Sequence, residues 1–275
     1  MTSARSETDK RPILVASHPR SGTHLVIDTL RRQFPQTRAW RPWGMPTDHL
    51  YFNLERATSE RRPFGDQNAQ KIAARASRPI LKTHYLADYS QTWREDETGP
   101  MPAFSRDLIA SAQTIYVLRH PVATLRSYHR FLAGIDPLYG RMDFVAFLRS
   151  PHWGGETDVI GWWARHVSGW IAREDVLLVK YEDLTHDPSG TLGRFELFLG
   201  AAPSGVLPIL PPHRKSRMSV QIERILSLAP RSTAIVAPRY GALSAAAKEP
   251  LPARDIDWIG TRIGDVADEI GYSIL

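Results

Sequence analysis

The fold is decided by the stretch Pro12-Ile13-Leu14-Val15-Ala16-Ser17-His18-Pro19-Arg20-Ser21-Gly22-Thr23-His24-Leu25. Its first five residues form an apolar run typical of a buried strand, and the residues from about 22 to 33 have the pattern of a helix. A polar turn joins the two. Backbone N–H groups in such a turn, together with the N-terminus of the helix, form a binding site for an anion.

The residues of this turn suit an anion. Arg20 supplies a fixed cation, Gly22 lets the backbone come close to a ligand, and Ser21, Thr23 and His24 supply hydrogen-bond donors. The Gly-x-x-x-x-Gly-Lys-Ser/Thr loop of nucleoside triphosphatases is absent, because this turn has one glycine and no Gly-Lys pair. A kinase or GTPase is therefore disfavoured, while a turn that merely precedes a helix stays open as an alternative.

Three further apolar runs repeat this rhythm of strand, polar turn and helix. They lie at 79–83, 114–118 and 176–180, and their aliphatic, non-alternating composition predicts strands covered on both faces. Helices are predicted at about 22–33, 121–132, 158–173, 188–199, 216–228 and 256–270. The sequence therefore predicts an α/β fold with a central parallel β-sheet flanked by helices.

Length and composition limit the alternatives. The 275 residues suffice for one large domain, which we expect to span 1–275 with a flexible start at 1–11. The absence of cysteine excludes disulfides and favours the cytoplasm. We find no signal-peptide core and no run near the ~20 apolar residues of a membrane span. The net charge of +6 favours anionic partners such as nucleic acid, a membrane surface or a small charged ligand.

Polar side chains follow the other predicted strands as well. Arg119 lies at the carboxyl end of the third strand, where open α/β sheets bind ligands, and Ser127 lies on the second turn of the helix that follows. Lys82-Thr83-His84 ends the second strand, and Tyr181-Glu182-Asp183-Leu184 follows the fourth.

These segments together resemble the sulfotransferases that use 3'-phosphoadenosine-5'-phosphosulfate (PAPS). Pro19, Ser21, Gly22 and Thr23 match the Tyr-Pro-Lys-Ser-Gly-Thr-Thr-Trp loop of the cytosolic members, whereas Arg20, His24 and Leu25 depart from it. The segment 119–128 is similar to the family's Arg-Asn-Pro-x-Asp-x-x-x-Ser-Tyr, and the segments 82–84 and 181–184 are similar to its Lys-Thr-His and Tyr-Glu-Asp-Leu. The resemblance fades beyond about residue 200.

The resemblance implies a sulfotransferase fold of the P-loop nucleotide-binding type, with PAPS as co-substrate, PAP as product and no required metal. His84 would be the general base, Lys82 would orient the acceptor side, and Arg20 would neutralise charge on the leaving oxygen. The residues implied to bind the nucleotide are Pro19, Arg20, Ser21, Gly22, Thr23, His24, Arg119, Ser127 and Tyr181. The family's C-terminal Arg-Lys-Gly anchor is not matched; Arg239-Tyr240-Gly241 is the nearest segment and Arg214-Lys215 a rival.

The segments 35–63, 85–105 and 134–153 carry aromatic and Arg residues and are expected to select the acceptor, the first two as long loops. We expect a hydroxyl or amine acceptor on a carbohydrate, glycolipid or glycosylated small molecule, and no nucleic-acid partner. A divergent P-loop kinase and a non-catalytic nucleotide-binding or nucleic-acid-binding protein remain alternatives. His18, His24 and His120 remain alternatives to His84 as the base.

Overall fold

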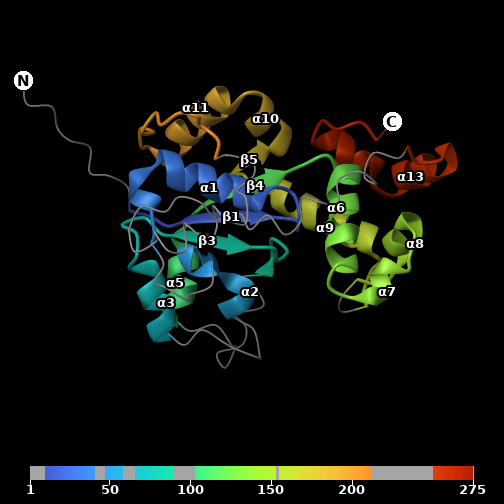
Figure 1. Ribbon diagram of the computed structural model, residues 1–275, viewed down its shortest axis with the longest axis horizontal. Coiled ribbons are helices and arrows are strands. Elements are labelled where there is room, and N and C mark those ends of the chain that lie inside the picture. Colours follow the sequence, from blue (N-terminus) through green and yellow to red (C-terminus); the bar gives the residue numbers. More distant parts are fainter. Residues whose placement is uncertain are drawn as a thin grey trace, which may run out of the picture.

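A five-stranded, all-parallel sheet lies at the centre of the protein (Figure 1), in the order β2-β3-β1-β4-β5. The computed structural model describes residues 10–40, 47–57, 66–89, 103–152, 155–211 and 250–274. Its strands are β1 (Ile13–Ser17), β2 (Phe52–Asn53), β3 (Ile80–Thr83), β4 (Gln113–Leu118) and β5 (Val176–Lys180). The predicted fold class is confirmed.

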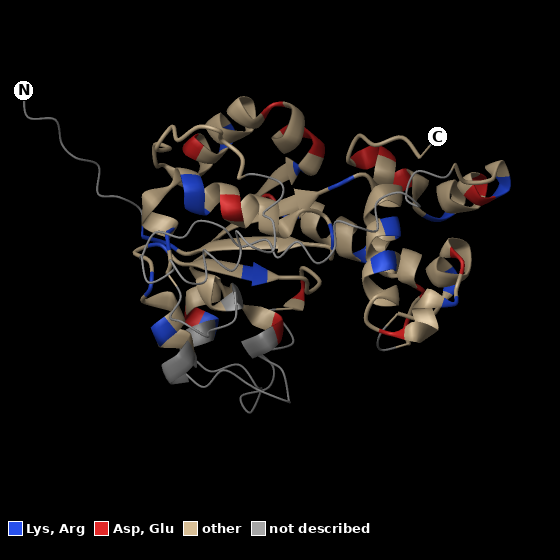
Figure 2. Ribbon diagram, in the orientation of Figure 1, with Lys and Arg blue, Asp and Glu red and all other residues tan. Residues whose placement is uncertain are grey.

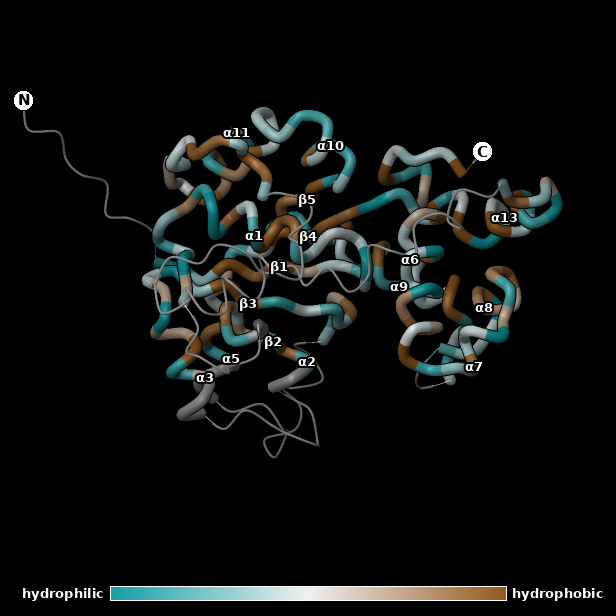
Figure 3. The backbone as a smooth tube through the Cα atoms, viewed as in Figure 1, coloured by the Kyte–Doolittle hydropathy of each residue, from teal (hydrophilic) through white to brown (hydrophobic). Residues whose placement is uncertain are grey.

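Helices cover both faces of the sheet. Successive residues of a strand point to opposite faces, and because these strands are apolar throughout, both faces must be buried. Ile13 and Val15 belong to one buried cluster with side chains of α1 (Thr23–Gln33) and α11 (Pro188–Leu199). Leu14 and Ala16 belong to a second cluster with side chains of α3 (Asp66–Ala73), α6 (Pro121–Ala133) and α9 (Val159–Ile171). Figure 3, which colours the backbone by hydropathy, accordingly shows hydrophobic strands at the centre of the molecule, between the two layers of helices.

The strand order places the carboxyl ends of the central strands at one edge. β1 pairs with β3 on one side and with β4 on the other. The strands before β4 are therefore added toward one edge of the sheet, and β4 and β5 are added toward the other edge. The register pairs Ala16 with Thr83 and Ser17 with Val117, which keeps the three strand ends level. Such a switch point leaves a crevice in which α/β proteins bind ligands.

The remaining helices complete the layers. They are η1 (Pro35–Thr37), η2 (Thr47–Leu50), α2 (Leu54–Ala57), α5 (Ala103–Ala110), α7 (Pro137–Gly140), α8 (Phe144–Arg149), α10 (Tyr181–His186) and α13 (Ala253–Glu269). Trp163 and Trp170 of α9 are buried. α13 packs on α9, where Arg262 Nη2 lies 2.7 Å from Asp158 Oδ2.

The prediction of long loops at 35–63 and 85–105 was wrong in part. The described residues of the first stretch hold η1, η2, β2 and α2, and α5 begins at Ala103 within the second. These elements are only two to eight residues long, so they show almost no apolar period, and β2 pairs with β3 through Phe52 and Asn53 alone. The predicted helix 216–228 lies outside the described residues.

No helix in the described part of the chain combines the length and the apolar character needed to cross a bilayer.

Candidate functional site

The turn after β1 is shaped by two residues in the left-handed region of backbone space. Arg20 has a φ of 72° and Gly22 a φ of 108°. A positive φ is unusual for an arginine and costs on the order of 1–3 kcal/mol, so the structure around Arg20 must hold it there. α1 begins at Thr23, and its N-cap residue Gly22 has no side chain to cap it. The N-terminus of α1 therefore faces this turn with backbone N–H groups that suit an anion.

The hydroxyl and imidazole groups of the turn lie on its inner side. Ser21 is buried, and Thr23 Oγ1 lies 2.6 Å from Ser17 Oγ. The Pro19 carbonyl accepts a hydrogen bond from His18 Nδ1 at 2.8 Å. These contacts fix the turn against the end of β1.

Gly22 is required for a second reason, which the sequence did not reveal. A Cβ atom at this position would lie 2.6 Å from Tyr181 Cδ2. Tyr181 begins α10 directly after β5, and the guanidinium carbon of Arg119 lies 4.5 Å from the centre of its ring. The turn, the end of β4 and the end of β5 thus bring Gly22, Arg119 and Tyr181 together.

Arg20 links the turn to α6. Its Nε donates to Ser127 Oγ at 3.3 Å, and its backbone carbonyl accepts from Arg119 Nη1 at 3.2 Å. The guanidinium also lies 5.2 Å from the ring centre of Phe131. The structure therefore assembles Arg20, Arg119 and Ser127, three residues to which the resemblance gives contacts with the nucleotide.

His84 lies immediately after β3, beside the turn. Its Nδ1 lies 2.7 Å from the carbonyl oxygen of Ser17. A carbonyl oxygen can only accept, so Nδ1 carries the proton and Nε2 of the neutral ring keeps its lone pair. Burial, and then the charge of Lys82, lower the pKa of His84 well below 6.5. The ring is therefore neutral at neutral pH and can accept a proton through Nε2.

Glu55 on α2 holds this segment in place, and the sequence did not single it out. Its Oε2 accepts from Lys82 Nζ at 2.9 Å, and its Oε1 accepts from Thr83 Oγ1 at 3.0 Å and from the backbone N–H of His84. Glu55 lay inside a predicted loop with no motif around it. Lys82 could have indicated that an acidic residue such as Glu55 lies nearby, because a lysine inside a buried strand needs an acidic partner.

Two of the other histidines near the strand ends, His24 and His120, are engaged elsewhere, and the third, His18, is buried. His24 Nε2 lies 3.0 Å from Tyr51 Oη, and burial together with Lys82 and Arg20 lowers its pKa to about 4. His18 is buried, and burial lowers its pKa well below 6.5. His120 Nε2 donates to the Ser273 carbonyl at 3.0 Å.

A further buried histidine, His166 on α9, supports the backbone of His84. Its Nε2 donates to the His84 carbonyl at 3.1 Å, so its Nδ1 accepts from Tyr116 Oη at 2.8 Å. Burial lowers the pKa of His166 to about 3. The ring is therefore neutral, and it joins β4 to the segment that carries His84.

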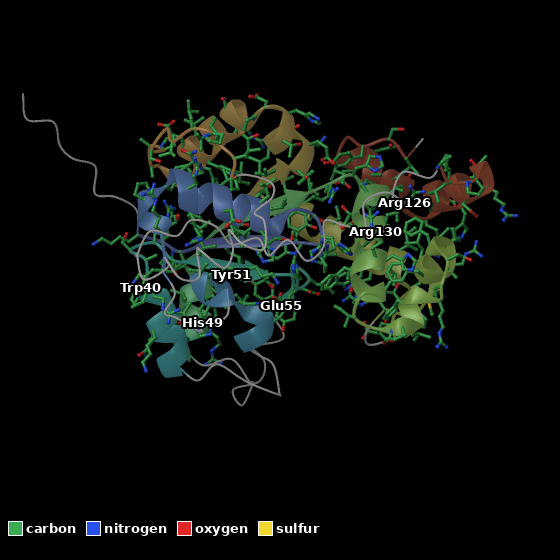
Figure 4. All side chains as sticks on the ribbon, viewed as in Figure 1. Trp40, His49, Tyr51, Glu55, Arg126 and Arg130 are labelled. Carbon is green, nitrogen blue, oxygen red and sulfur yellow. The ribbon has the colours of Figure 1, made fainter. Side chains whose placement is uncertain are left out.

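The segments expected to select the acceptor differ in where they lie. Figure 4 shows Tyr51 and Glu55 on the side of β2 and α2, and Arg126 and Arg130 on α6. Trp40 is 47% exposed, but it follows the C-terminal end of α1, and Figure 4 shows it far from Arg126 and Arg130. In contrast, Tyr89 is buried against Trp170, with ring centres 6.0 Å apart, so it belongs to the core.

Several predicted site residues lie outside the described residues. They are the C-terminal candidates Arg239, Gly241, Arg214 and Lys215, and the aromatic residues Trp43, Trp93 and Trp153.

The chain is similar to known sulfotransferases. The family model described as "Sulfotransferase domain" matches residues 10–219. Sulfotransferase 2A6 of Mus musculus is 24% identical over 193 residues, which are 68% of this chain and 59% of that protein. The 3-alpha-hydroxysteroid sulfotransferase of Cavia porcellus is 31% identical over 106 residues, 37% of this chain and 36% of that protein. The matched segments thus span less than two thirds of either relative.

Two solved structures share the fold. Mouse sulfotransferase SULT7A1, complexed with PAP, has a TM-score of 0.51 and 16% identity, over 95% of this chain and 89% of that one. Retinol dehydratase in a complex with retinol and PAP has a TM-score of 0.51 and 16% identity, over 95% and 83% of the two chains. Because the family model covers well over half of its length, the chain belongs to the sulfotransferase domain family.

Proposed function

We propose that this protein transfers a sulfuryl group from PAPS to a hydroxyl or amine of an acceptor and releases PAP. The observation that carries the proposal is the hydrogen bond from His84 Nδ1 to the Ser17 carbonyl. It ties the candidate base to the residue at which the anion-binding turn begins, and it leaves Nε2 free to accept a proton. A base next to an anion site is the arrangement that in-line group transfer requires.

The residues present suit PAPS as a substrate. The uncapped start of α1 and the cation Arg20 suit the phosphosulfate, while Arg119 and Ser127 suit a 3'-phosphate. Tyr181, packed between Gly22 and Arg119, offers a flat ring for the adenine. The described residues supply a cation or an N–H group for each anionic part of the substrate.

The proposed reaction is a single displacement at sulfur. The acceptor oxygen forms a bond to sulfur while the bond from sulfur to the bridging phosphate oxygen breaks, and PAP leaves with that electron pair. His84 Nε2 takes the acceptor proton, a step worth on the order of 10²–10⁴ in rate. Arg20 stabilises the charge that develops on the bridging oxygen, and Glu55 keeps Lys82 and the backbone of His84 in position.

The acceptor that we propose is a carbohydrate, a glycolipid or a glycosylated small molecule. The Trp and Arg content of the segments 35–63, 85–105 and 134–153 supports this class, because an indole face stacks on a sugar ring. One relative is named for a 3-alpha-hydroxysteroid, so an apolar alcohol is the natural comparison acceptor.

The test is transfer of radiolabelled sulfuryl from PAPS to a panel that contains simple glycosides, glycolipids, phenols and a hydroxysteroid. We expect a labelled product with at least one glycosylated acceptor, no need for added metal, and a rate about 10²–10⁴-fold lower with His84→Ala. Transfer confined to the hydroxysteroid or phenols would refute the acceptor class alone. The absence of PAP binding by the wild-type protein would refute the proposed activity itself.

A further inference from the structure

Arg130 lies on α6 close to the nucleotide site, at a position to which the family resemblance gives no role. It follows Ser127 by three residues, and residues at this spacing are neighbours on one face of a helix. α6 carries basic residues and no acidic ones (Figure 2), and Figure 4 shows Arg126 and Arg130 on this helix. The face that presents the Ser127 hydroxyl therefore continues into a guanidinium.

The guanidinium of Arg130 is costly to the free protein. Its Nη1 is buried and has no hydrogen-bond partner among the described residues, and no carboxylate in that part of the chain pairs with it. A buried donor without an acceptor destabilises a fold. Burial, and then the charges of Arg119 and Arg126, lower the pKa of Arg130. An arginine kept under these conditions is typical of a site that receives an anion.

Arg119 connects Arg130 to the nucleotide. Arg119 stands at the end of β4 beside Tyr181, and its charge acts on Arg130. The charge of Arg126 also acts on Arg130, but its guanidinium lies 5.6 Å from the ring centre of Phe144 on α8. Arg119, Ser127 and Arg130 therefore form the group on α6 and β4 that can surround one anion.

A phosphate monoester carries about −1.5 to −2 charges at neutral pH and three acceptor oxygens. Arg119 and the neutral hydroxyl of Ser127 balance one of these charges, and a second guanidinium balances the rest. We propose that Arg130 is a third contact for the 3'-phosphate of the nucleotide, with its buried Nη1 as the donor. This inference rests on the proposed function, because it takes PAPS and PAP as the ligands.

The test is calorimetric titration with PAP and with adenosine 5'-phosphate, which lacks the 3'-phosphate. Arg130→Gln should weaken PAP binding on the order of 10- to 100-fold, the usual cost of a lost hydrogen bond to a charged group, and leave adenosine 5'-phosphate within about twofold. Arg130→Lys, which keeps the charge but not the fork, should fall between wild type and Arg130→Gln. Arg141→Gln is the matched control, because it removes the same charge at an exposed position after α7.

A PAP affinity for Arg130→Gln equal to that of wild type would overturn the inference. Equal weakening of PAP and adenosine 5'-phosphate would overturn it too, because the effect would then not depend on the 3'-phosphate. Thermal unfolding of the ligand-free variants checks folding, and Arg130→Gln should melt no lower than wild type, because it removes a buried N–H group that has no hydrogen-bond partner among the described residues. Failure of wild type to bind PAP would instead overturn the proposed function.

Discussion

The two sides of the site differ in how the chain builds them. The nucleotide side consists of Arg20, Gly22, Arg119, Ser127 and Tyr181, which stand at or soon after the ends of β1, β4 and β5. The base side consists of Glu55, Lys82, Thr83 and His84, and its centre is a carboxylate from a four-residue helix. The backbone positions the first side, whereas one side chain from elsewhere in the sequence positions the second.

The largest expected effect is on the transfer rate, when the proposed base His84 is removed. His84→Ala should lower the rate of sulfuryl transfer by about 10²–10⁴-fold and leave the affinity for PAP unchanged, because His84 acts on the acceptor proton. Initial rates and calorimetry measure the two quantities. His24→Ala is the comparison variant, because His24 is a rival base whose Nε2 is engaged with Tyr51. Retained activity in His84→Ala together with loss in His24→Ala would assign the base to His24.

Gly22→Ala tests whether the backbone positions the nucleotide side. The new Cβ would lie 2.6 Å from Tyr181 and would keep a φ of 108°, so the ring and the turn must both move. We expect PAP affinity to fall by at least about tenfold, by analogy with the loss of one or two charged hydrogen bonds. Gly200→Ala is the matched control, because Gly200 has a φ of 61° but open space around its Cβ. A normal PAP affinity for Gly22→Ala would contradict this view of the turn.

Glu55→Gln tests whether one side chain holds the base side. Lys82 is buried, and loss of its partner should reduce the free energy of unfolding by about 1–3 kcal/mol. A double-mutant cycle with Lys82→Met, followed by chemical denaturation, isolates the pair. The double variant should lose less than the two single variants together. Strict additivity would mean that the contact contributes nothing.

The smallest expected effect is on the pH dependence of the unfolding free energy, which the buried neutral histidines cause. In the folded protein the pKa of His24 is lowered to about 4 and that of His166 to about 3, so between these values and 6.5 the unfolded chain binds more protons. Unfolding free energy should therefore fall as the pH drops from 6.5 to 5, before most carboxylates protonate. His166→Gln should reduce this slope by up to about 1.4 kcal/mol per pH unit. An unchanged slope would mean that folding does not lower the pKa of His166.

The sequence singled out the residues of the proposed nucleotide side because they follow apolar strands in continuous motifs, and their role in binding stays a prediction. All four long strands and five of the predicted helices are present, and the turn joins β1 to α1 as expected. The contact between Gly22 and Tyr181 joins residues far apart in the chain, so no local pattern could show it. Glu55 was missed for the same reason: a two-residue edge strand and a single turn of helix leave no periodicity to read.

The most direct test of the central claim is a titration of wild type and Arg119→Ala with PAP and with ATP plus Mg²⁺. The account predicts metal-independent binding of PAP by wild type, weaker binding of ATP, and loss of PAP binding in Arg119→Ala. Preference for ATP with Mg²⁺, or PAP binding that does not depend on Arg119, would contradict the account and favour a kinase or another nucleotide-binding protein.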